Sequence, residues 1–127
     1  MLMNQRQYPQ VTGTIAAASE EYLWPFDNAG TATNVYARVD MWRSLSFGCT
    51  NTGASNAITA SLIEGCWGDP DTDENWVALA SGTLTPAVDA TEADEIELAE
   101  HGFPKYLRVT LTSSSGTTFA LDAIGRA

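Results

Sequence analysis

Alternation between apolar and polar side chains over short segments is the feature that most constrains how this 127-residue chain can fold. A period of two residues puts successive side chains on opposite faces of a strand, so each segment predicts a strand with one buried face. Clusters of Gly, Pro, Asn and Ser separate the segments, and no long amphipathic helical pattern stands out. About seven or eight short strands at nearly regular spacing predict an all-β fold, namely an antiparallel β-sandwich or jelly roll.

The clearest pair of predicted strands lies near the C-terminal end of the sequence. Residues 107–111 and 119–123 alternate in polarity, and the turn formers at 113–116 separate them. If their apolar sides share one face of a hairpin, the numbers of paired residues sum to 230 and the loop has an odd length. This register brings together Leu107, Val109 and Leu111 with Ala123, Leu121 and Phe119.

A second hairpin is predicted in the middle of the chain, with residues 51–56 as its polar turn. Its inward side chains would be Leu45, Phe47 and Cys49 on one strand and Ile58, Ala60 and Leu62 on the other. This register places Cys49 and Cys66 far apart along the ladder, which excludes a disulfide between them. We therefore interpret both cysteines as small buried apolar residues.

Three further strands are predicted at Val35–Met41, Leu84–Val88 and Glu95–Leu98. In the last of these, Ile96 and Leu98 would face inward because they alternate with acidic residues. The polar residues 67–75 lie between two apolar runs, and such clusters of turn formers are typical of a long hairpin loop.

The N-terminal residues differ from the rest of the chain. Residues before about Val11 offer no apolar face to bury, and Pro9 disfavours a central strand. We expect residues 1–12 to form an extended N-terminal arm, either frayed or ordered on a partner, and residues 13–127 to form a single β-sandwich domain. The start of the sequence also lacks the apolar core of a signal peptide, so we expect a protein that is not secreted.

The formal net charge of −10 comes from one part of the sequence. Eleven acidic residues and no Lys or Arg lie from Glu64 to Glu100, whereas the rest of the chain holds five acidic and six basic residues. Nucleic acids and anionic membranes bind clustered Lys and Arg, so this charge argues against both as partners. We expect the acidic loops to lie together at one end or edge of the sandwich.

No motif in the sequence identifies catalytic, cofactor-binding or metal-binding residues. The acidic loop Asp69–Asn75 alternates as a calcium loop does, but Glu74 and Ala80 stand where an EF-hand needs Gly and Glu. This favours a solvated turn, with a calcium site in a β-loop as the alternative. His101 stands alone, so we interpret it as a turn residue and not as part of a zinc site or triad. Paired carboxylates of a glycosidase stay open as an alternative, because 16 acidic residues offer many pairs. We predict a protein that is not an enzyme and binds no cofactor.

Aromatic side chains are the best candidates for a partner interface. Four Trp and four Tyr residues could form a sugar-stacking platform or a protein interface, although most Trp residues of a β-sandwich belong to its core. Trp42 alternates out of phase with Leu45 and Phe47, so its side chain would either point outward or cover a second layer. The candidate interface residues are Tyr8, Pro9, Trp24 and Trp42.

Several segments between residues 58 and 124 resemble small β-sandwich proteins of tailed-bacteriophage virions. In those proteins a strand ends in a pair such as Glu-Gly, a turn leads to Asn-Trp, and a later strand reads Tyr-Leu-Arg-Val. The matching residues here are Glu64-Gly65, Asn75-Trp76 and Tyr106-Leu107-Arg108-Val109. The resemblance implies a non-enzymatic structural protein of the capsid decoration or cement type, with no catalytic residues to carry over.

A decoration protein binds and stabilises the lattice of the major capsid protein, often as a trimer. The resemblance therefore implies the major capsid protein or another virion protein as partner, a homo-oligomer, and a location in the virion after synthesis in the host cytoplasm. The alternatives are a carbohydrate-binding jelly-roll module, which a row of surface Trp residues would favour, and another tail, neck or fibre component.

Overall fold

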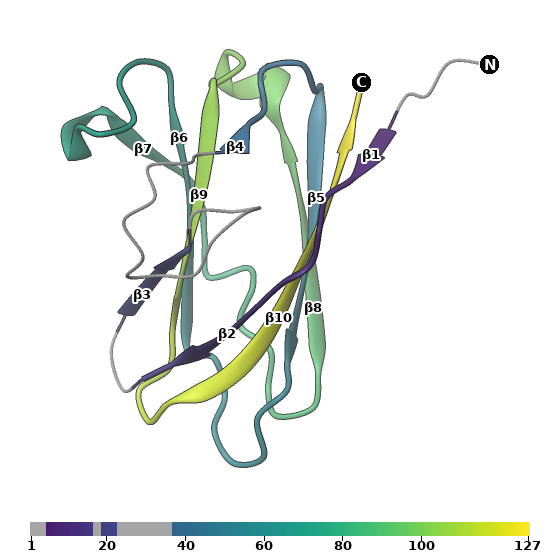
Figure 1. Ribbon diagram of the computed structural model, residues 1–127, viewed down its shortest axis with the longest axis vertical. Coiled ribbons are helices and arrows are strands. Elements are labelled where there is room, and N and C mark those ends of the chain that lie inside the picture. The colour runs from purple at the N-terminus through teal and green to yellow at the C-terminus, as the bar shows by residue number, and fades with distance from the viewer. Residues whose placement is uncertain (1–4, 17–18, 23–36) are drawn as a thin grey trace.

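The computed structural model describes residues 5–16, 19–22 and 37–127 (Figure 1). In these residues ten strands form two antiparallel sheets of five strands, and the helical elements are two short 3-10 helices, η1 (Asp73–Asn75) and η2 (Leu98–His101). No helix in this part of the chain is long and apolar enough to cross a membrane. The predicted all-β sandwich is confirmed.

Both sheets have a strand from the C-terminal part of the chain near their middle. Sheet A runs in the order β1–β10–β5–β8, with β2 also pairing with β10, and sheet B runs in the order β3–β9–β6–β7, with β4 also pairing with β9. The strands of sheet A are β1 (Gln5–Gln7), β2 (Val11–Ile15), β5 (Ser44–Asn51), β8 (Thr91–Glu97) and β10 (Thr117–Arg126). Those of sheet B are β3 (Ser19–Tyr22), β4 (Ala37–Arg38), β6 (Ala60–Cys66), β7 (Trp76–Ser81) and β9 (Tyr106–Thr112).

Eight of these strands form a jelly roll. Apart from the short β1 and β4, the chain passes from one sheet to the other at every connection except that between β6 and β7. The resulting orders, β2–β10–β5–β8 and β3–β9–β6–β7, are those of two interlocked Greek keys. Strands that are neighbours in a sheet therefore come from distant parts of the sequence.

The predicted C-terminal hairpin is wrong for this reason. β9 lies in sheet B and β10 in sheet A, so residues 113–116 cross from one sheet to the other. The inward faces were predicted correctly, since all six apolar side chains of the two strands are buried: Leu107, Val109, Leu111, Phe119, Leu121 and Ala123. These residues belong to one core cluster between the sheets and do not sit side by side in a ladder.

The predicted middle hairpin is wrong in the same way, because β5 belongs to sheet A and β6 to sheet B. On β5 the predicted inward residues are buried, but on β6 the phase differs by one residue. Ile63 is fully buried and Ser61 is buried, whereas Ala60 is exposed and Leu62 only half-buried. In a direct hairpin the turn would fix which side chains of the second strand face inward. Residues 52–59 instead cross from one sheet to the other, so the inward side chains of β6 lie one residue away from those predicted.

The remaining strand predictions have mixed outcomes. The hairpin that joins β6 to β7 through residues 67–75 is confirmed, as are the buried Ile96 and Leu98. Residues 84–88 form no strand, because they cross between the sheets. Of the predicted strand Val35–Met41, residues 35 and 36 lie outside the described residues and β4 covers only Ala37–Arg38.

Both cysteines are buried free thiols, as predicted, and they lie on strands of different sheets. Burial, with a smaller contribution from the charge of Glu92, raises the pKa of Cys49 to about 12. The Cys49 thiol therefore stays protonated at neutral pH and is a poor nucleophile.

Residues 5–12, predicted as part of an arm, are extended but belong to sheet A of the same chain. β1 pairs with the last residues of β10, and β2 pairs with its first half. The boundary expected between residues 12 and 13 falls inside β2. The physical reason is that strand β10 has ten residues, so it offers edge hydrogen bonds to both segments in turn.

Candidate partner-binding surface

The four predicted interface residues have different surroundings. Tyr8 is buried and its backbone N–H donates to the carbonyl of Ala123, whereas Pro9 next to it is exposed. Trp42 lies two residues before β5, half-buried against the core, and its Nε1–H donates to the Tyr8 hydroxyl. Trp24 lies outside the described residues. The structure thus brings Tyr8 and Trp42 together as an internal contact, with ring centroids 6.5 Å apart.

Gly125 of β10 makes room for this contact. A Cβ atom at position 125 would lie 2.6 Å from the indole of Trp42, well inside van der Waals contact. The Arg6 guanidinium also lies 4.9 Å from the centre of the Tyr8 ring. Trp42 therefore lies closely over the backbone of β10, and Tyr8 attaches the N-terminal strand to it.

We expect Gly125→Ala to lower the free energy of unfolding by about 1–3 kcal/mol, because Trp42 must move and release Tyr8. Gly48→Ala is the matched control: Gly48 lies in β5 of the same sheet, and a Cβ atom there meets nothing within 4 Å. Urea unfolding, followed by tryptophan fluorescence, measures the free energy of unfolding of both variants. Equal midpoints for the two variants would contradict the packing of Trp42 over β10.

Three loops meet at one end of the sandwich, at the top of Figure 1: residues 39–43, 67–75 and 98–105. We call this the aromatic end. Backbone hydrogen bonds join the three loops, from Leu98 to Arg43 and from Lys105 to Cys66 beside the second loop. Three of the four large apolar side chains that are exposed in the described residues lie here, namely Met41, Trp67 and Phe103. The fourth, Val77, is the second residue of β7, the strand that begins directly after the loop 67–75.

Trp67 and Phe103 are held close to one another by a turn. The indole Nε1–H of Trp67 donates to the carbonyl of Gly102 at 3.0 Å, and Phe103 follows Gly102 in the chain. Gly102 and Phe103 both have positive φ, +74° and +54°, where they end the helix η2. Phe103 also donates its backbone N–H to the carbonyl of Leu98. Both aromatic rings are thus attached to a defined backbone and remain partly exposed.

A buried ion pair supports the loop 67–75 from below. The Nε of Arg108 lies 2.9 Å from a carboxylate oxygen of Glu64, directly across the β6–β9 pair, and both side chains are nearly buried. The guanidinium also lies 4.5 Å from the centre of the Trp76 ring and 3.5 Å from the Asp73 carboxylate. Trp76 in turn donates its indole N–H to the carbonyl of Pro70. The loop therefore folds over the outer face of sheet B and is fixed there.

The acidic residues do not gather at a single place, which corrects the expectation for the segment from Glu64 to Glu100. Four lie in the loop 67–75, four are spread along β8, and Asp89 lies near the opposite end. The aromatic end is nevertheless acidic, with six Asp or Glu residues against Arg43 and Lys105 in its three loops. One of these six, Asp40, accepts hydrogen bonds from Arg38, which lower the pKa of its carboxyl group.

The loop Asp69–Asn75 is organised by its own hydrogen bonds. The Asp69 carboxylate accepts from the backbone N–H of Asp71 and the hydroxyl of Thr72, and the Asp69 carbonyl accepts from Asn75. Within the described ranges, no group of three or more His, Cys, Asp or Glu side chains is arranged to hold a metal ion. These bonds fix the Asp69 side chain and the backbone around it within the loop.

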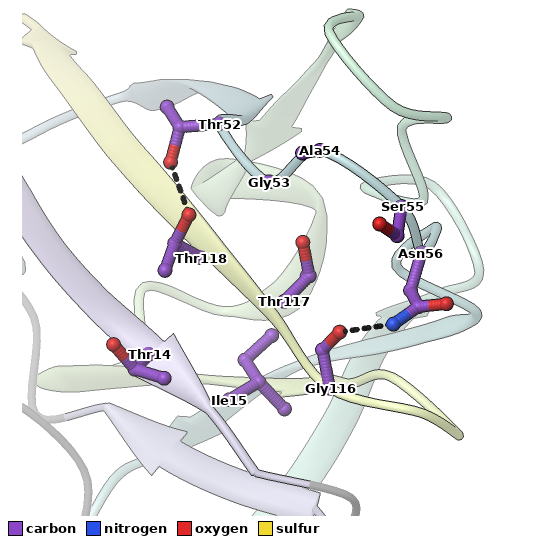
Figure 2. A pocket seen from close by; sticks show the side chains of 10 residues that line it. All are labelled: Thr14, Ile15, Thr52, Gly53, Ala54, Ser55, Asn56, Gly116, Thr117 and Thr118. Carbon is purple, nitrogen blue, oxygen red and sulfur yellow. Dashed lines mark hydrogen bonds between the residues drawn. The ribbon is translucent and has the colours of Figure 1, made fainter.

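The opposite end of the sandwich has a different chemistry. Its loops, residues 52–59, 82–90 and 113–116, contain Asp89 as their one charged residue and are rich in Ser and Thr; we call it the hydroxyl end. An open hollow of about 510 Å³ lies there, between the end of β2, the loop after β5 and the start of β10; Figure 2 shows the residues that line it. Thr52 and Thr118 share a hydrogen bond at its rim, and Asn56 donates to the carbonyl of Gly116.

Asn51 holds the loops of the hydroxyl end together from beneath. Its side chain is fully buried, and its amide donates to the carbonyls of Asn56 and Pro86. Its Oδ1 accepts from the Gly53 N–H and the Thr117 hydroxyl. One side chain thus connects the loop after β5, the loop before β8 and the start of β10.

Sequence reasoning did not select Trp67 and Phe103 as interface residues. A usable signal was present for Trp67, because it comes directly after the predicted strand and begins a run of polar turn formers. For Phe103 the signal was its place directly after Gly102. The sequence predicted a turn there, but it did not predict that Phe103 has a positive φ. Neither residue stands out from the other aromatics without the fold.

No protein-family model matches the chain, and no curated protein matches its sequence. Among solved structures, the chain is similar to a protein of the empty virus-like particle of Cowpea mosaic virus, with a TM-score of 0.51, 8% identity, and coverage of 96% of this chain and 83% of that one. A chain from the naturally occurring empty particles of the same virus gives a TM-score of 0.50, 6% identity, and coverage of 96% and 86%. These similarities show a shared jelly-roll fold, and at such low identity they show the fold alone.

A family 11 carbohydrate-binding module from Clostridium thermocellum is also found among the solved structures. It has 10% identity, and 100% of this chain and 91% of that one are covered, but its TM-score is 0.39. That score is too low to connect the two proteins in function.

Proposed function

We propose that this chain is a non-enzymatic structural protein of a bacteriophage virion, and specifically a capsid decoration protein that binds and stabilises the lattice of the major capsid protein. The observation that carries the proposal is the strand order β2–β10–β5–β8 and β3–β9–β6–β7. This jelly roll is an architecture that viral capsid domains use. The resemblance of residues 58–124 to virion β-sandwich proteins supports the same role.

The distribution of side chains supports a binding role over a catalytic one. His101 is the single histidine of the chain, and it lies in η2 on the aromatic end. The Glu64 carboxylate is engaged by Arg108, and the Asp69 carboxylate by its own loop. The net charge of −10 favours a protein partner over nucleic acid or an anionic membrane.

The test is binding to expanded capsids that lack decoration. We expect the purified protein to sediment with such capsids and to reach saturation at a fixed number of copies for each capsid subunit. Native mass spectrometry of the free protein tests the proposed homo-oligomer, for which a trimer would match a three-fold lattice site. If the protein stays in the supernatant with the capsids, the decoration role is wrong.

A carbohydrate-binding module is the alternative function. Specific signals on a glycan array, together with no capsid binding, would favour it. Location of the protein at a tail, neck or fibre in electron micrographs of the virion would favour another structural component.

A further inference from the structure

We propose that the aromatic end is the surface through which this protein docks on its partner, and that the partner presents a protein surface with basic residues around apolar recesses. This inference rests on the proposed function, because it identifies the part of the chain that would meet the capsid. Four observations on the described residues support it.

The first observation is where the exposed apolar side chains lie. Met41 is 52% exposed, Phe103 49% and Trp67 37%, and all three come from loops that meet at one end. Single exposed apolar residues are common on monomers, but a group of large ones on neighbouring loops is typical of an interaction site. The hydroxyl end contains no large apolar side chain with comparable exposure in the residues that the structure describes.

The second observation is the backbone of Phe103. Its φ of +54° is unfavourable for a bulky side chain, and the same turn would form more easily with Gly or Asn at that position. The other non-glycine residue with positive φ in the described part is Asp89, a type that tolerates this conformation. A half-exposed phenyl ring in a strained conformation does not serve the stability of the monomer, so we infer that it serves binding.

The third observation is that Trp67 is held in position before any partner arrives. Its indole N–H is bonded to Gly102 at 3.0 Å while more than a third of the residue stays exposed. An aromatic residue that is already fixed loses little conformational entropy on binding, and Trp residues of this kind often dominate the affinity of protein interfaces.

The fourth observation is charge. Six acidic residues and two basic ones lie in the three loops of the aromatic end, whereas the hydroxyl end is almost uncharged. Arg108 lies under this end, where it pairs with Glu64 and also lies 3.5 Å from the Asp73 carboxylate, so it offsets only part of the acidic charge of the loop 67–75. Complementary charge on the partner would therefore be positive, which also makes a second copy of this acidic chain a poor occupant.

The experiment compares variants at the two ends in the same capsid sedimentation assay. We expect Trp67→Ala and Phe103→Gly each to weaken binding about 10-fold or more. Phe103→Gly should at the same time raise the melting temperature, because Gly relieves the positive φ. The matched control is Ala54→Arg, which adds a large side chain at an exposed position of the hydroxyl end and should leave binding unchanged.

Salt dependence tests the chemistry of the partner. Raising the salt concentration from 50 to 500 mM should weaken binding of the unaltered protein by about 10-fold if the partner surface is basic. Binding that strengthens or does not change with salt would overturn the proposed charge complementarity.

The outcomes separate the two proposals. If the unaltered protein does not bind capsids, the decoration function fails. If it binds, but Trp67→Ala and Phe103→Gly bind equally well while Ala54→Arg does not, the function stands and the docking surface is wrong. Hydrogen exchange of the bound protein gives a second readout that does not depend on variants, and we expect protection in residues 98–105 and not in residues 113–116.

Discussion

Replacing Arg108 with Ala should lower the free energy of unfolding by about 3–5 kcal/mol, the usual cost of removing one partner of a buried ion pair. Arg108 is 8% exposed, and its Nε lies 2.9 Å from the Glu64 carboxylate. Without the guanidinium, that carboxylate would be left nearly buried and unpaired. The ring of Trp76 would also lose the cation that lies 4.5 Å from its centre.

Two comparisons isolate the buried charge as the cause. Arg43→Ala removes an ion pair with Glu97 in which the Arg43 side chain is 73% exposed, so we expect a loss below about 1 kcal/mol. The double variant Glu64→Leu, Arg108→Met removes both charges and should recover most of the loss from Arg108→Ala. Urea unfolding measures the free energy of unfolding of Arg108→Ala, Arg43→Ala and the double variant. A double variant as unstable as Arg108→Ala would show that packing, not the unpaired charge, dominates at this site.

The same substitution should act on the aromatic end. Arg108 reaches Asp73 at 3.5 Å, and Trp76 beneath the loop 67–75 is bonded to Pro70. Loss of Arg108 therefore loosens the loop that positions Trp67. We expect faster hydrogen exchange in residues 67–75 than in the loops of the hydroxyl end.

The inward faces of most strands could be predicted from the sequence, but the pairing of those strands could not. Alternation in β5, β9 and β10 identifies the buried side chains correctly because period two follows from strand geometry alone. Pairing depends on where the chain crosses between sheets, and a crossing loop such as residues 113–116 has the composition of a hairpin turn. The jelly-roll order therefore appears only with long-range contacts such as β2 with β10.

The candidate interface shows the same limit. Tyr8 was selected because an N-terminal segment without an apolar face looks free, yet β10 provides the edge on which this segment folds. Trp42 was selected because it alternates out of phase with Leu45 and Phe47, yet it packs against the core. Trp67 and Gly102 are 35 residues apart in the sequence, and only the fold brings the Trp67 indole to the Gly102 carbonyl next to Phe103. Composition around each residue separately contains no sign of that contact.

Asn51→Ala should also destabilise the protein strongly, by about 2–4 kcal/mol. Asn51 is fully buried, and its side chain makes four hydrogen bonds to three separate segments. Truncation removes the Asn51 Oδ1, which accepts from the Thr117 hydroxyl and the Gly53 N–H. The methyl group of Ala cannot accept a hydrogen bond, so both donors lose this acceptor. Asn75→Ala is the matched control, since Asn75 is half-buried and donates one bond within its own loop, and its loss should stay near about 1 kcal/mol.

The effect of Asn51→Ala on binding should be small despite its effect on stability. The network lies beneath the hydroxyl end, so hydrogen exchange should accelerate in residues 52–57 and 113–117 and not in residues 98–105. Below its melting temperature the variant should bind capsids with an affinity close to that of the unaltered protein, whereas Arg108→Ala should bind more weakly. If Asn51→Ala abolishes binding while the aromatic end keeps its protection, the hollow in Figure 2 and not the aromatic end contacts the partner.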